Sequence, residues 1–425
     1  MIYLTYKLIN LKNKRENMII GIDDTDSPNG MCTTYLAAKL KKKFKIKSTL
    51  RLIRLNPNIP YKTRGNGAVA IVTDFNHKIR KEVIDYITTY SHLSHKKTNP
   101  GIAFVPKLSR KKQIILEKFY RKVVSEHVSI IEAEDTAVEI GAEVIKFKNG
   151  RGIIGALAAC GAVLDDKTFE LIAYREKRNY GQERKINFQS VFSMNEKFYP
   201  KCFDSVDIVS NQILITPHGP DPIFCGIRGK SSMVVKKAWN DIIPLEKIEF
   251  IQVFETNQAS DDHLKWKKIR EIKPFDCVKI SGKVSSNPKT IQGGHVFFKL
   301  MDETGEIDCG AYRQTGEFRD VMKQLCTGDE IIVYGGIGRH SNTLNLEKIC
   351  IEKLKSILLD TPPLCCGRKM TSSGKNKGFK CRKCNNKIRK VMKTKVFRDI
   401  ELGWFEVPPR ARRHLSKPLV RFNRK

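Results

Sequence analysis

The sequence predicts a multidomain α+β protein, and three observations support this fold class. Apolar strand-like runs and amphipathic helical patterns alternate from residue 18 to about residue 258, which is typical of sheets covered by helices. From residue 277 the chain changes to short strands at close spacing, which favours a small β-barrel. A group of cysteines follows in a strongly basic C-terminal region. A chain of 425 residues is long enough for two to four such domains.

The charge of the chain indicates a polyanionic partner. Its formal net charge is +33, which is too large for a protein that meets only small neutral substrates. From Cys365 to the C-terminus twenty Lys and Arg stand against three Asp and Glu, so +17 of that charge lies in the last 61 residues. The sequence contains no run typical of a transmembrane span. Its twelve cysteines are scattered apart from one terminal cluster, which favours a reducing cytoplasm.

The first seventeen residues lack the long apolar core and the small-residue cleavage site of a signal peptide. A second methionine, Met18, opens the first convincing strand. We therefore expect residues 1–17 to be a dispensable N-terminal extension.

The stretch from Met18 to Leu40 carries the strongest functional signal. An apolar strand ends in the turn Asp23-Asp24-Thr25-Asp26, and a helical pattern begins at Thr33. Three carboxylates can hold a hard cation through oxygen. The opening of the helix offers unpaired backbone N–H groups and a positive dipole end, which suit phosphate. The stretch therefore predicts a magnesium–nucleotide site.

The alternative is an acidic turn that only caps a helix, with Thr33 as an N-cap that contributes about 1 kcal/mol. One cap needs one carboxylate, however, and three carboxylates in four residues repel each other unless a cation lies between them. A calcium loop would need an oxygen ligand where Pro28 stands. A P-loop is excluded because no Gly-Lys-Ser/Thr follows a glycine run.

The next predicted strand, Leu50 to Leu55, leads into a loop from Asn56 to Gly67 that holds the cations Lys62 and Arg64. Such a loop suits an extended segment wrapped on phosphates, and a solvated surface loop is equally open. Amphipathic helices are expected over Ile79 to Thr89 and Lys112 to Val124, with a second turn of similar chemistry between them at Lys97-Thr98-Asn99-Pro100-Gly101.

Gly150-Arg151-Gly152-Ile153-Ile154-Gly155 is a G-x-G-x-x-G between a predicted strand and a helix from Ala156. A dinucleotide-binding fold is therefore one interpretation. A usable acidic residue after the following strand is not obvious, since Glu170 lies inside its strand pattern. The favoured alternative is a tight turn with close packing of the helix on the sheet.

Strands and two helices between Arg151 and Gln252 suggest an α+β, split-βαβ domain. Within it, His218-Gly219-Pro220-Asp221-Pro222 follows a strand and precedes Phe224 to Gly229. A His, an Asp and an Arg on such turns can build a site, although a structural histidine is the alternative.

Five strands are predicted from Cys277 to Cys350, with a helix over Gly316 to Leu325 between the third and the fourth. This is the order of an OB barrel, a common holder of single-stranded nucleic acid. An SH3-like barrel is the alternative, but the position of the helix favours the OB fold.

The terminal cysteines predict a zinc ribbon. Cys381 and Cys384 have the spacing of a zinc knuckle, whereas Cys365 and Cys366 are adjacent. Two adjacent thiolates rarely reach one ion without straining the backbone, so we expect at least one of that pair to bind zinc and leave a spectator role open for the other. The basic segment from Pro408 to Leu415 is expected to be an arm that binds a nucleic-acid backbone rather than part of a core.

Taken together, these motifs resemble the archaeal tRNA(Ile2) 2-agmatinylcytidine synthetase family, and the resemblance covers nearly the whole chain after Met18. The segments that carry it are Gly21 to Ser27, Gly30 to Thr34, Arg51 to Pro57, Lys62 to Gly67, His218 to Pro222, the OB region and the terminal cysteines. The departure is the adjacent Cys365-Cys366 pair, where a spaced pair is expected.

The resemblance implies an architecture. It divides the chain into the dispensable extension 1–17, a kinase-like α/β catalytic domain 18–148, a ferredoxin-like domain 149–258, an OB fold 270–355, a zinc ribbon 360–390 and a basic tRNA-binding tail 391–425.

The resemblance also implies an ATP-dependent ligase. Such an enzyme activates C2 of the wobble cytidine of tRNA(Ile2) by phosphorylation and joins agmatine to it, which changes codon reading from AUG to AUA. The expected cofactors are ATP, Mg²⁺ and structural Zn²⁺. The expected partners are tRNA(Ile2) and agmatine, without a membrane and with the oligomeric state left open.

Site residues follow from the same resemblance. The implied catalytic residues are Asp23, Asp24, Asp26 and Thr33. The implied ATP-binding residues are Thr25, Ser27, Thr34, Arg64, Gly65 and Asn66. The implied substrate-binding residues are His218, Asp221, Lys97 and Asn99, with Asp221 as the candidate carboxylate for agmatine. The implied zinc ligands are Cys365, Cys366, Cys381 and Cys384.

Two competing hypotheses remain open from the residues. A non-catalytic RNA-binding protein built from the OB barrel and the zinc ribbon explains the charge, but it gives the acidic turn no function. An ATP-dependent enzyme that modifies another RNA is the second.

Overall fold

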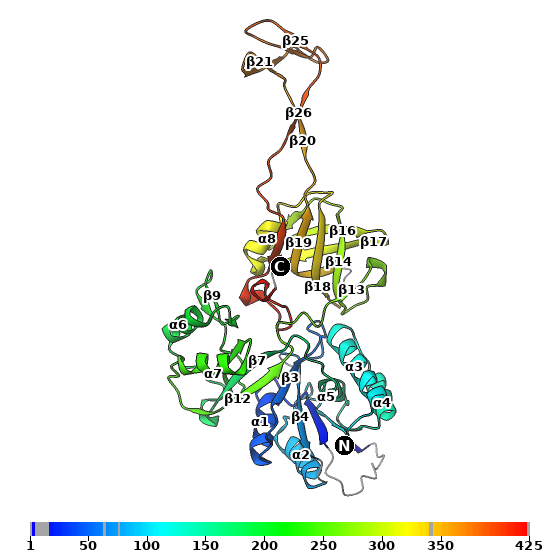
Figure 1. Cartoon of the computed structure of the whole chain (residues 1–425), viewed down its shortest axis with the longest axis vertical. Coiled ribbons are helices and arrows are strands. Elements are labelled where there is room, and N and C mark those ends of the chain that lie inside the picture. Colours follow the sequence, from blue (N-terminus) through cyan, green and yellow to red (C-terminus); the bar gives the residue numbers. More distant parts are fainter. Residues whose placement is uncertain (1, 5–16, 63–64, 75–76, 340–342, 423–425) are drawn as a thin grey trace.

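The computed structural model describes residues 2–4, 17–62, 65–74, 77–339 and 343–422. A wide sheet with its helices lies at one end of the long axis, a β-barrel lies in the middle, and a two-stranded stalk with a small cysteine-containing unit lies at the other end (Figure 1). The last part of the chain returns from the stalk to the barrel, where it pairs with a barrel strand.

A single ten-stranded sheet runs through the first 256 residues in the order β1-β6-β5-β2-β4-β3-β12-β7-β11-β8. Its strands are β1 (Ile2–Leu4), β2 (Asn17–Asp23), β3 (Leu50–Arg54), β4 (Gly67–Asp74), β5 (Gly101–Val105), β6 (Glu143–Phe147), β7 (Thr168–Arg175), β8 (Cys202–Phe203), β11 (Ile223–Gly229) and β12 (Ile248–Thr256). The described pairings are antiparallel except for β3 with β12, which is parallel. The expected α/β class of the first domain is therefore corrected to α+β, because βαβ crossovers between parallel neighbours do not build its sheet.

Two units of the same topology stand side by side in this sheet. In the first, β2-α1-β3-β4-α2-β5 gives the spatial order β5-β2-β4-β3. In the second, β7-α6-β8-β11-α7-β12 gives the order β12-β7-β11-β8. Each is a β-α-β-β-α-β unit, so the predicted split-βαβ domain is confirmed and the same topology also occurs before it. The parallel β3–β12 pair joins the two units edge to edge.

Helices cover both faces of the first unit. They are α1 (Thr33–Lys43), α2 (His77–Tyr90), α3 (Arg110–Ser125), α4 (Ile130–Ile140) and α5 (Gly152–Cys160), and the second unit adds α6 (Phe188–Phe198) and α7 (Ser232–Asn240). One core contains α1 and α2, and a separate core contains α3, α4 and α5. No helix in the described part of the chain is long and apolar enough to cross a membrane.

Strand β2 lies between the two cores, which fixes the position of the acidic turn at its end. Ile20 and Ile22 point into the core with α1, and each is fully buried. Burial of such a side chain contributes about 1.5–3 kcal/mol. Gly21 points to the other face, where an added Cβ would lie 1.9 Å from the carbonyl oxygen of Ala156 in α5. Any side chain at position 21 would therefore collide with the backbone of α5.

The glycine motif before α5 serves this close packing. An added Cβ on Gly152 would lie 2.3 Å from the backbone nitrogen of Gly101 in β5. Because α5 crosses the antiparallel strands β2 and β5 and no Rossmann βαβ follows, the dinucleotide interpretation of Gly150 to Gly155 is wrong and the packing alternative is confirmed.

The sequence analysis missed α4. Its start carries a capping box in which Ser129 Oγ accepts from the backbone of Glu132 and Glu132 accepts from the backbone of Ser129. Its end carries Gly141 in the left-handed region at φ 76°. The Ser-x-x-Glu pattern and the glycine were the available signal.

The barrel confirms the predicted OB fold. It contains β13 (Lys265–Trp266), β14 (Cys277–Val284), β15 (Lys289–Ile291), β16 (His295–Asp302), β17 (Gly305–Ala311), β18 (Glu330–Ile337) and β19 (Thr343–Lys353), with α8 (Glu317–Met322) between β17 and β18. The path β14-β18-β19-β17-β16 closes through the pairing of β16 with β14. The helix lies between the third and fourth long strands, as expected.

A stalk of β20 (Leu358–Thr361) and β26 (Met392–Lys395) carries the cysteine-containing unit away from the barrel (Figure 1). That unit consists of the short strands β21 (Leu364–Cys365), β22 (Arg368–Lys369), β23 (Thr371–Ser372), β24 (Phe379–Lys380) and β25 (Lys387–Ile388). Such small hairpins bury little apolar surface, so the unit depends on its cysteines for stability.

The expected basic arm is corrected. Residues 403–406 form β27 (Gly403–Glu406) on β19, and Leu415 is fully buried. Arg410 pairs with Asp207 at 2.7 Å, and Arg412 pairs with Asp204. These carboxylates lie in the second unit of the sheet, so the segment straps the barrel to the sheet. Arginines that face protein carboxylates at these distances make a packed connection rather than a free arm.

Candidate active site

The turn Asp23–Asp26, which we call the acidic turn, is held by two backbone amides. Asp23 Oδ1 accepts from the backbone nitrogen of Asp24 at 2.7 Å, and Asp24 Oδ2 accepts from the backbone nitrogen of Asn99 at 3.0 Å. Asp24 adopts a left-handed backbone conformation with φ 53°. Such conformations cost free energy in a residue with a Cβ and are enriched at functional sites.

The electrostatics of the acidic turn are unfavourable without a cation. Burial and the charge of Asp24 raise the pKa of Asp23 well above its ordinary value. Burial and the charge of Asp26 raise the pKa of Asp24 to about 7, although the backbone N–H of Asn99 opposes the shift. A divalent cation between these carboxylates would remove the repulsion that raises both values.

Thr33 does not serve as the N-cap of α1. That position belongs to Cys32, which makes no side-chain capping bond. The Thr33 hydroxyl is instead within hydrogen-bond distance of the Thr25 hydroxyl, at 3.0 Å, and both residues are buried. The capping alternative is therefore wrong, and the hydroxyl of Thr33 faces the acidic turn.

A segment before β5 supports the turn from the other side. Thr98 Oγ1 donates to the carbonyl oxygen of Asp26 at 2.7 Å, and His92 Nδ1 lies 2.7 Å from Ser27 Oγ. Ser27 is fully buried in this contact. The side chain predicted to bind ATP is thus engaged in holding the turn.

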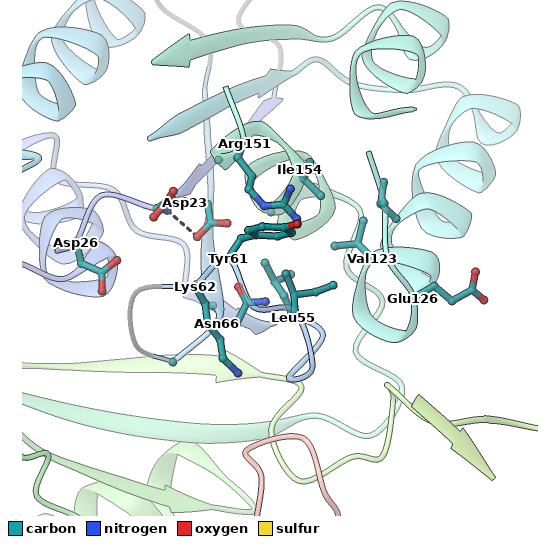
Figure 2. A pocket seen from close by; sticks show the side chains of 17 residues that line it. Asp23, Asp26, Leu55, Tyr61, Lys62, Asn66, Val123, Glu126, Arg151 and Ile154 are labelled. Atoms are coloured by element: carbon teal, nitrogen blue, oxygen red, sulfur yellow. Dashed lines mark hydrogen bonds between the residues drawn. The ribbon is translucent and has the colours of Figure 1, made fainter. Parts of the chain in front are cut away.

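Two cavities adjoin the acidic turn. The first, shown in Figure 2, is lined by Asp23, Asp24 and Asp26 together with the start of α5. Arg151 lies over the Tyr61 ring at 4.2 Å from its centroid, and both line this cavity with Lys62. It therefore places cations opposite the carboxylates.

The second cavity, of about 330 Å³, reaches from the opening of α1 to the second unit of the sheet. Asp26, Thr33 and Thr34 line one side. Because its volume exceeds the about 60 Å³ of the first cavity, we call it the large cavity. Its far wall is formed by β7 and β11. Leu171 and Ala173 of β7 point into the core with α6 and α7, so Glu170 and Ile172, which alternate with them, point to the opposite face and line the cavity.

Charged groups in the wall of the large cavity are already paired. Glu170 lies 3.3 Å from Arg54 and 3.4 Å from Arg228. Burial raises the pKa of Glu170, but the charges of the two arginines outweigh it and hold the pKa below its ordinary value. Asp221 is buried and lies 3.2 Å from Arg184 Nη2. A cationic ligand at Asp221 would therefore compete with Arg184.

The structure brings most of the predicted residues together. One group surrounds the acidic turn or lines the first cavity: Asp23, Asp24, Asp26, Thr25, Thr33, Asn99, Gly65 and Asn66. Two further residues line the large cavity: Thr34 and Asp221. His218 and Lys97 are exposed, and neither lines these two cavities. Arg64 lies outside the described residues.

Several cavity residues escaped sequence reasoning. Glu170 was dismissed because it lies inside a strand, although a carboxylate in an apolar strand is itself a signal of a partner. Arg184 gave no pattern, since its role depends on pairing with Asp221, whereas Arg228 is the arginine that the sequence placed beside His218 and Asp221. His414 reaches the large cavity from the C-terminal segment, which no local motif predicts.

The four terminal cysteines form one cluster in which their sulfur atoms all lie within 4.8 Å of one another. Cys365 Sγ lies 3.9 Å from Cys366 Sγ and 3.4 Å from Cys384 Sγ. Sulfur atoms around a tetrahedral zinc at about 2.3 Å are about 3.8 Å apart, so the set fits this ion. Backbone N–H groups of Cys384 and Lys383 lower the pKa of the Cys381 thiol to about 6, which favours the thiolate that zinc binds.

The expectation of a spectator cysteine is thereby corrected. Cys366 has φ 50° and Gly367 has φ 75°, so the chain reverses in the left-handed region directly after Cys365. This turn lets two adjacent side chains point to the same centre, which an extended pair cannot do.

Comparison with known families gives matches along most of the chain. The TiaS TCKD domain matches residues 19–78, the TiaS FLD domain matches residues 150–263, and the TiaS C-terminal zinc ribbon domain matches residues 362–400. An OB-fold nucleic acid binding domain matches residues 278–349.

Full-length relatives agree. The tRNA(Ile2) 2-agmatinylcytidine synthetase TiaS of Pyrococcus horikoshii is 47% identical over 414 residues, with 94% of this chain and 96% of the relative covered. The protein of the same name from Methanosarcina acetivorans is 43% identical over 419 residues, with 95% and 97% covered.

Solved structures match with 96% of this chain and 98% of theirs covered. A crystal structure of a TiaS–tRNA(Ile2)–ATP complex has a TM-score of 0.87 at 39% identity. A TiaS–tRNA(Ile2)–AMPCPP–agmatine complex has a TM-score of 0.85 at 37% identity.

Proposed function

The chain belongs to the tRNA(Ile2) 2-agmatinylcytidine synthetase family, and on that premise we propose that the acidic turn is the centre at which it transfers phosphate from ATP. The protein is an ATP-dependent ligase that joins agmatine to a cytidine of tRNA(Ile2). The two alternatives left open by the residues, a non-catalytic RNA-binding protein and a modifier of another RNA, are set aside by the family.

The chemistry requires activation before substitution. The oxygen on C2 of cytosine is a poor leaving group until it carries a phosphate. Once it does, the amine of agmatine can form a bond to C2 while the C2–O bond breaks and phosphate leaves. In phosphoryl transfer a protein contributes mainly by positioning the reactants and by neutralising the charge on the phosphates.

We propose that Asp23, Asp24 and Asp26 hold Mg²⁺. The observation that carries this assignment is the group of three carboxylates in four residues, two of them with raised pKa values. Bound there, magnesium would neutralise charge on the phosphates during transfer. The opening of α1 and the Gly65–Asn66 loop, which border the same turn, would face the phosphates.

Thr33 has two physically open roles in this proposal. Its hydroxyl can donate to the terminal phosphate or bind the metal, as Ser and Thr do in other nucleotide sites. Alternatively it can accept the phosphate and become phosphothreonine. Its burial beside Thr25 supports either role, because the hydroxyl has a fixed position.

We further propose that the large cavity receives the cytidine and agmatine. It joins the acidic turn to the open face of the second unit and is large enough for a ligand. The cytidine must leave its stack in the anticodon loop to enter. Asp221 remains the proposed carboxylate for one cationic end of agmatine, with Arg184 as its present partner. The kinase-like relationship of the first domain and a cytoplasmic location are part of the same proposal.

The function is tested by one incorporation assay. Purified protein is incubated with magnesium, labelled agmatine and a panel of tRNA transcripts, with and without ATP. We expect label only in tRNA(Ile2) and only with ATP. Incorporation into the other transcripts at the same rate, or incorporation without ATP, would contradict the proposal.

A further inference from the structure

A third cavity lies where the C-terminal strap meets the loop after β3. It has a volume of about 410 Å³. Its lining residues are Arg54 at the end of β3, five residues of the following loop (Leu55, Pro57, Lys62, Gly65 and Asn66), and residues 413–415. Its charged and basic side chains are Arg54, Lys62, Arg413 and His414, and Asn66 is a neutral polar residue of the same wall. None of the described residues that line it is acidic. We call it the basic pocket.

Its cations are only partly neutralised from outside the pocket. Arg54 Nη2 contacts Glu170 at 3.3 Å, but its Nε is buried and has no hydrogen-bond partner among the described residues. Lys62 donates to the carbonyl oxygen of Pro57, which carries no full charge. Burial and the charge of the nearby Arg413 lower the pKa of Lys62, so the charged form of Lys62 is destabilised in this position.

His414 completes this wall. Its side chain is open to the cavity and makes no hydrogen bond with a described residue. The charge of Arg54 lowers the pKa of His414 well below its ordinary value, which favours a neutral ring that donates through one nitrogen and accepts through the other. An ideal Cβ on Gly65 would lie 3.0 Å from Arg54 Nη1 and 3.7 Å from His414 Nε2. The backbone of Gly65 therefore leaves both groups accessible.

Glu170 at 3.3 Å from Arg54 and Glu347 at 3.6 Å from Arg413 offset part of the charge from outside the pocket. Like charges that converge on one cavity from three segments still repel each other, and an anion inside the cavity would offset that repulsion. Arg54, Gly65 and His414 also line the large cavity, so the basic pocket opens toward the acidic turn. The substrates of the reaction offer phosphate from two sources, the RNA backbone and ATP.

We propose that the basic pocket is a phosphate-binding subsite in which Lys62, Arg54 and His414 hold one phosphate group of a substrate. This inference deepens the proposed function and rests on it. The shared chemistry is a phosphate oxyanion held by N–H donors, and the two sources are a backbone phosphate beside the target cytidine and a phosphate of ATP.

Binding measurements on full-length protein separate the sources. Lys62→Met and His414→Leu remove donors without breaking the buried Arg54–Glu170 pair, and the double variant removes both. Lys118→Met, on the exposed surface of α3, is the matched control for the loss of one charge. Affinity for tRNA(Ile2) transcript is measured across salt concentrations, affinity for ATP is measured separately, and melting temperatures confirm folding.

We expect the double variant to lose about tenfold in affinity for one of the two substrates, whereas Lys118→Met stays at the wild-type value. A loss for tRNA, with a salt slope smaller by about 0.7 to 0.9, identifies a backbone phosphate. A loss for ATP alone identifies the nucleotide. Unchanged affinity for both substrates would overturn the subsite. These results do not depend on turnover, so they remain distinct from a failure of the wild-type protein to incorporate agmatine.

Discussion

Gly155 of α5 lies directly against the carboxylate of Asp23: a Cβ added to Gly155 would be 1.9 Å from Asp23 Oδ2. The close approach of α5 to β2 therefore places the acidic turn on the helix that forms the floor of the first cavity. The glycine is required by the position of the carboxylate rather than by its own backbone conformation.

We predict that Gly155→Ala lowers turnover by at least tenfold, because Asp23 must move away from the turn to make room. The same clash should lower stability by about 1–3 kcal/mol. Agmatine incorporation is measured at a temperature where melting curves show the variant folded. The control is Gly338→Ala, whose added Cβ would have its nearest neighbour at 3.8 Å. Equal turnover in the two variants would show that the position of Asp23 is not critical.

The contact between the sheet and the barrel should be sensitive to acid. Glu347 of β19 lies 3.1 Å from His263 Nε2, and both side chains are buried. Burial raises the pKa of Glu347, but the charge and hydrogen bond of His263, followed by Arg413 and Lys348, outweigh it and lower the pKa to about 2.

Because the folded-state pKa of Glu347 lies below the unfolded value of about 4.3, its stabilisation is complete above that pH and is lost as the pH falls toward 2. We expect wild-type protein to lose roughly 3 kcal/mol from this group across that range, as an upper bound. Glu347→Gln should be less stable at pH 7 and should lose less than wild type on acidification. The free energy of unfolding of both proteins is measured by chemical denaturation at several pH values. An equal loss in the two proteins on acidification would contradict this account.

Both adjacent cysteines should bind zinc. We expect about one zinc per chain in the wild type and a clear loss in Cys365→Ser and in Cys366→Ser alike, because their sulfurs lie in one cluster. Metal content by mass spectrometry is the measurement, and Cys326→Ser, outside the cluster, is the control. One zinc per chain in Cys366→Ser, as in the wild type, would show that Cys366 does not bind the metal.

Thr33 separates a chemical role from a structural one. Thr33→Ser keeps the hydroxyl that meets Thr25, whereas Thr33→Val keeps the shape and loses it. We expect substantial turnover in the Ser variant and a loss of orders of magnitude in the Val variant. Intact-mass measurement after incubation with ATP alone shows whether Thr33 becomes phosphorylated. Near-normal turnover by folded Thr33→Val would exclude both proposed roles of the hydroxyl, as a ligand of phosphate or metal and as the phosphate acceptor.

The sequence was sufficient where the signal is local. The apolar run before Asp23, the short strands from Cys277 and the spacing of Cys381 and Cys384 each predict their element from neighbouring residues. Helix α4 carried its signal in the Ser129–Glu132 capping box, and that signal was overlooked.

What sequence reasoning could not reach depends on contacts between distant segments. The parallel pairing of β3 with β12 joins residues about two hundred positions apart, and no local pattern predicts it. The contact of Glu170 with Arg54 follows from that junction, and its contact with Arg228 follows from the pairing of β7 with β11. The basic strap was misjudged for the same reason, because Asp204 and Asp207, which neutralise it, lie in another domain.

The central claim is that the acidic turn holds the cation for phosphoryl transfer, and Asp24→Asn tests it most directly. Asn keeps the size of the side chain and tolerates the left-handed backbone at φ 53°, so the fold should be unaffected. The measurement is the rate of ATP-dependent agmatine incorporation into tRNA(Ile2) as magnesium is raised to saturation, with tRNA affinity measured in parallel. The account predicts turnover reduced by orders of magnitude at every magnesium concentration, with tRNA affinity nearly unchanged. Normal turnover by Asp24→Asn at saturating magnesium would contradict it.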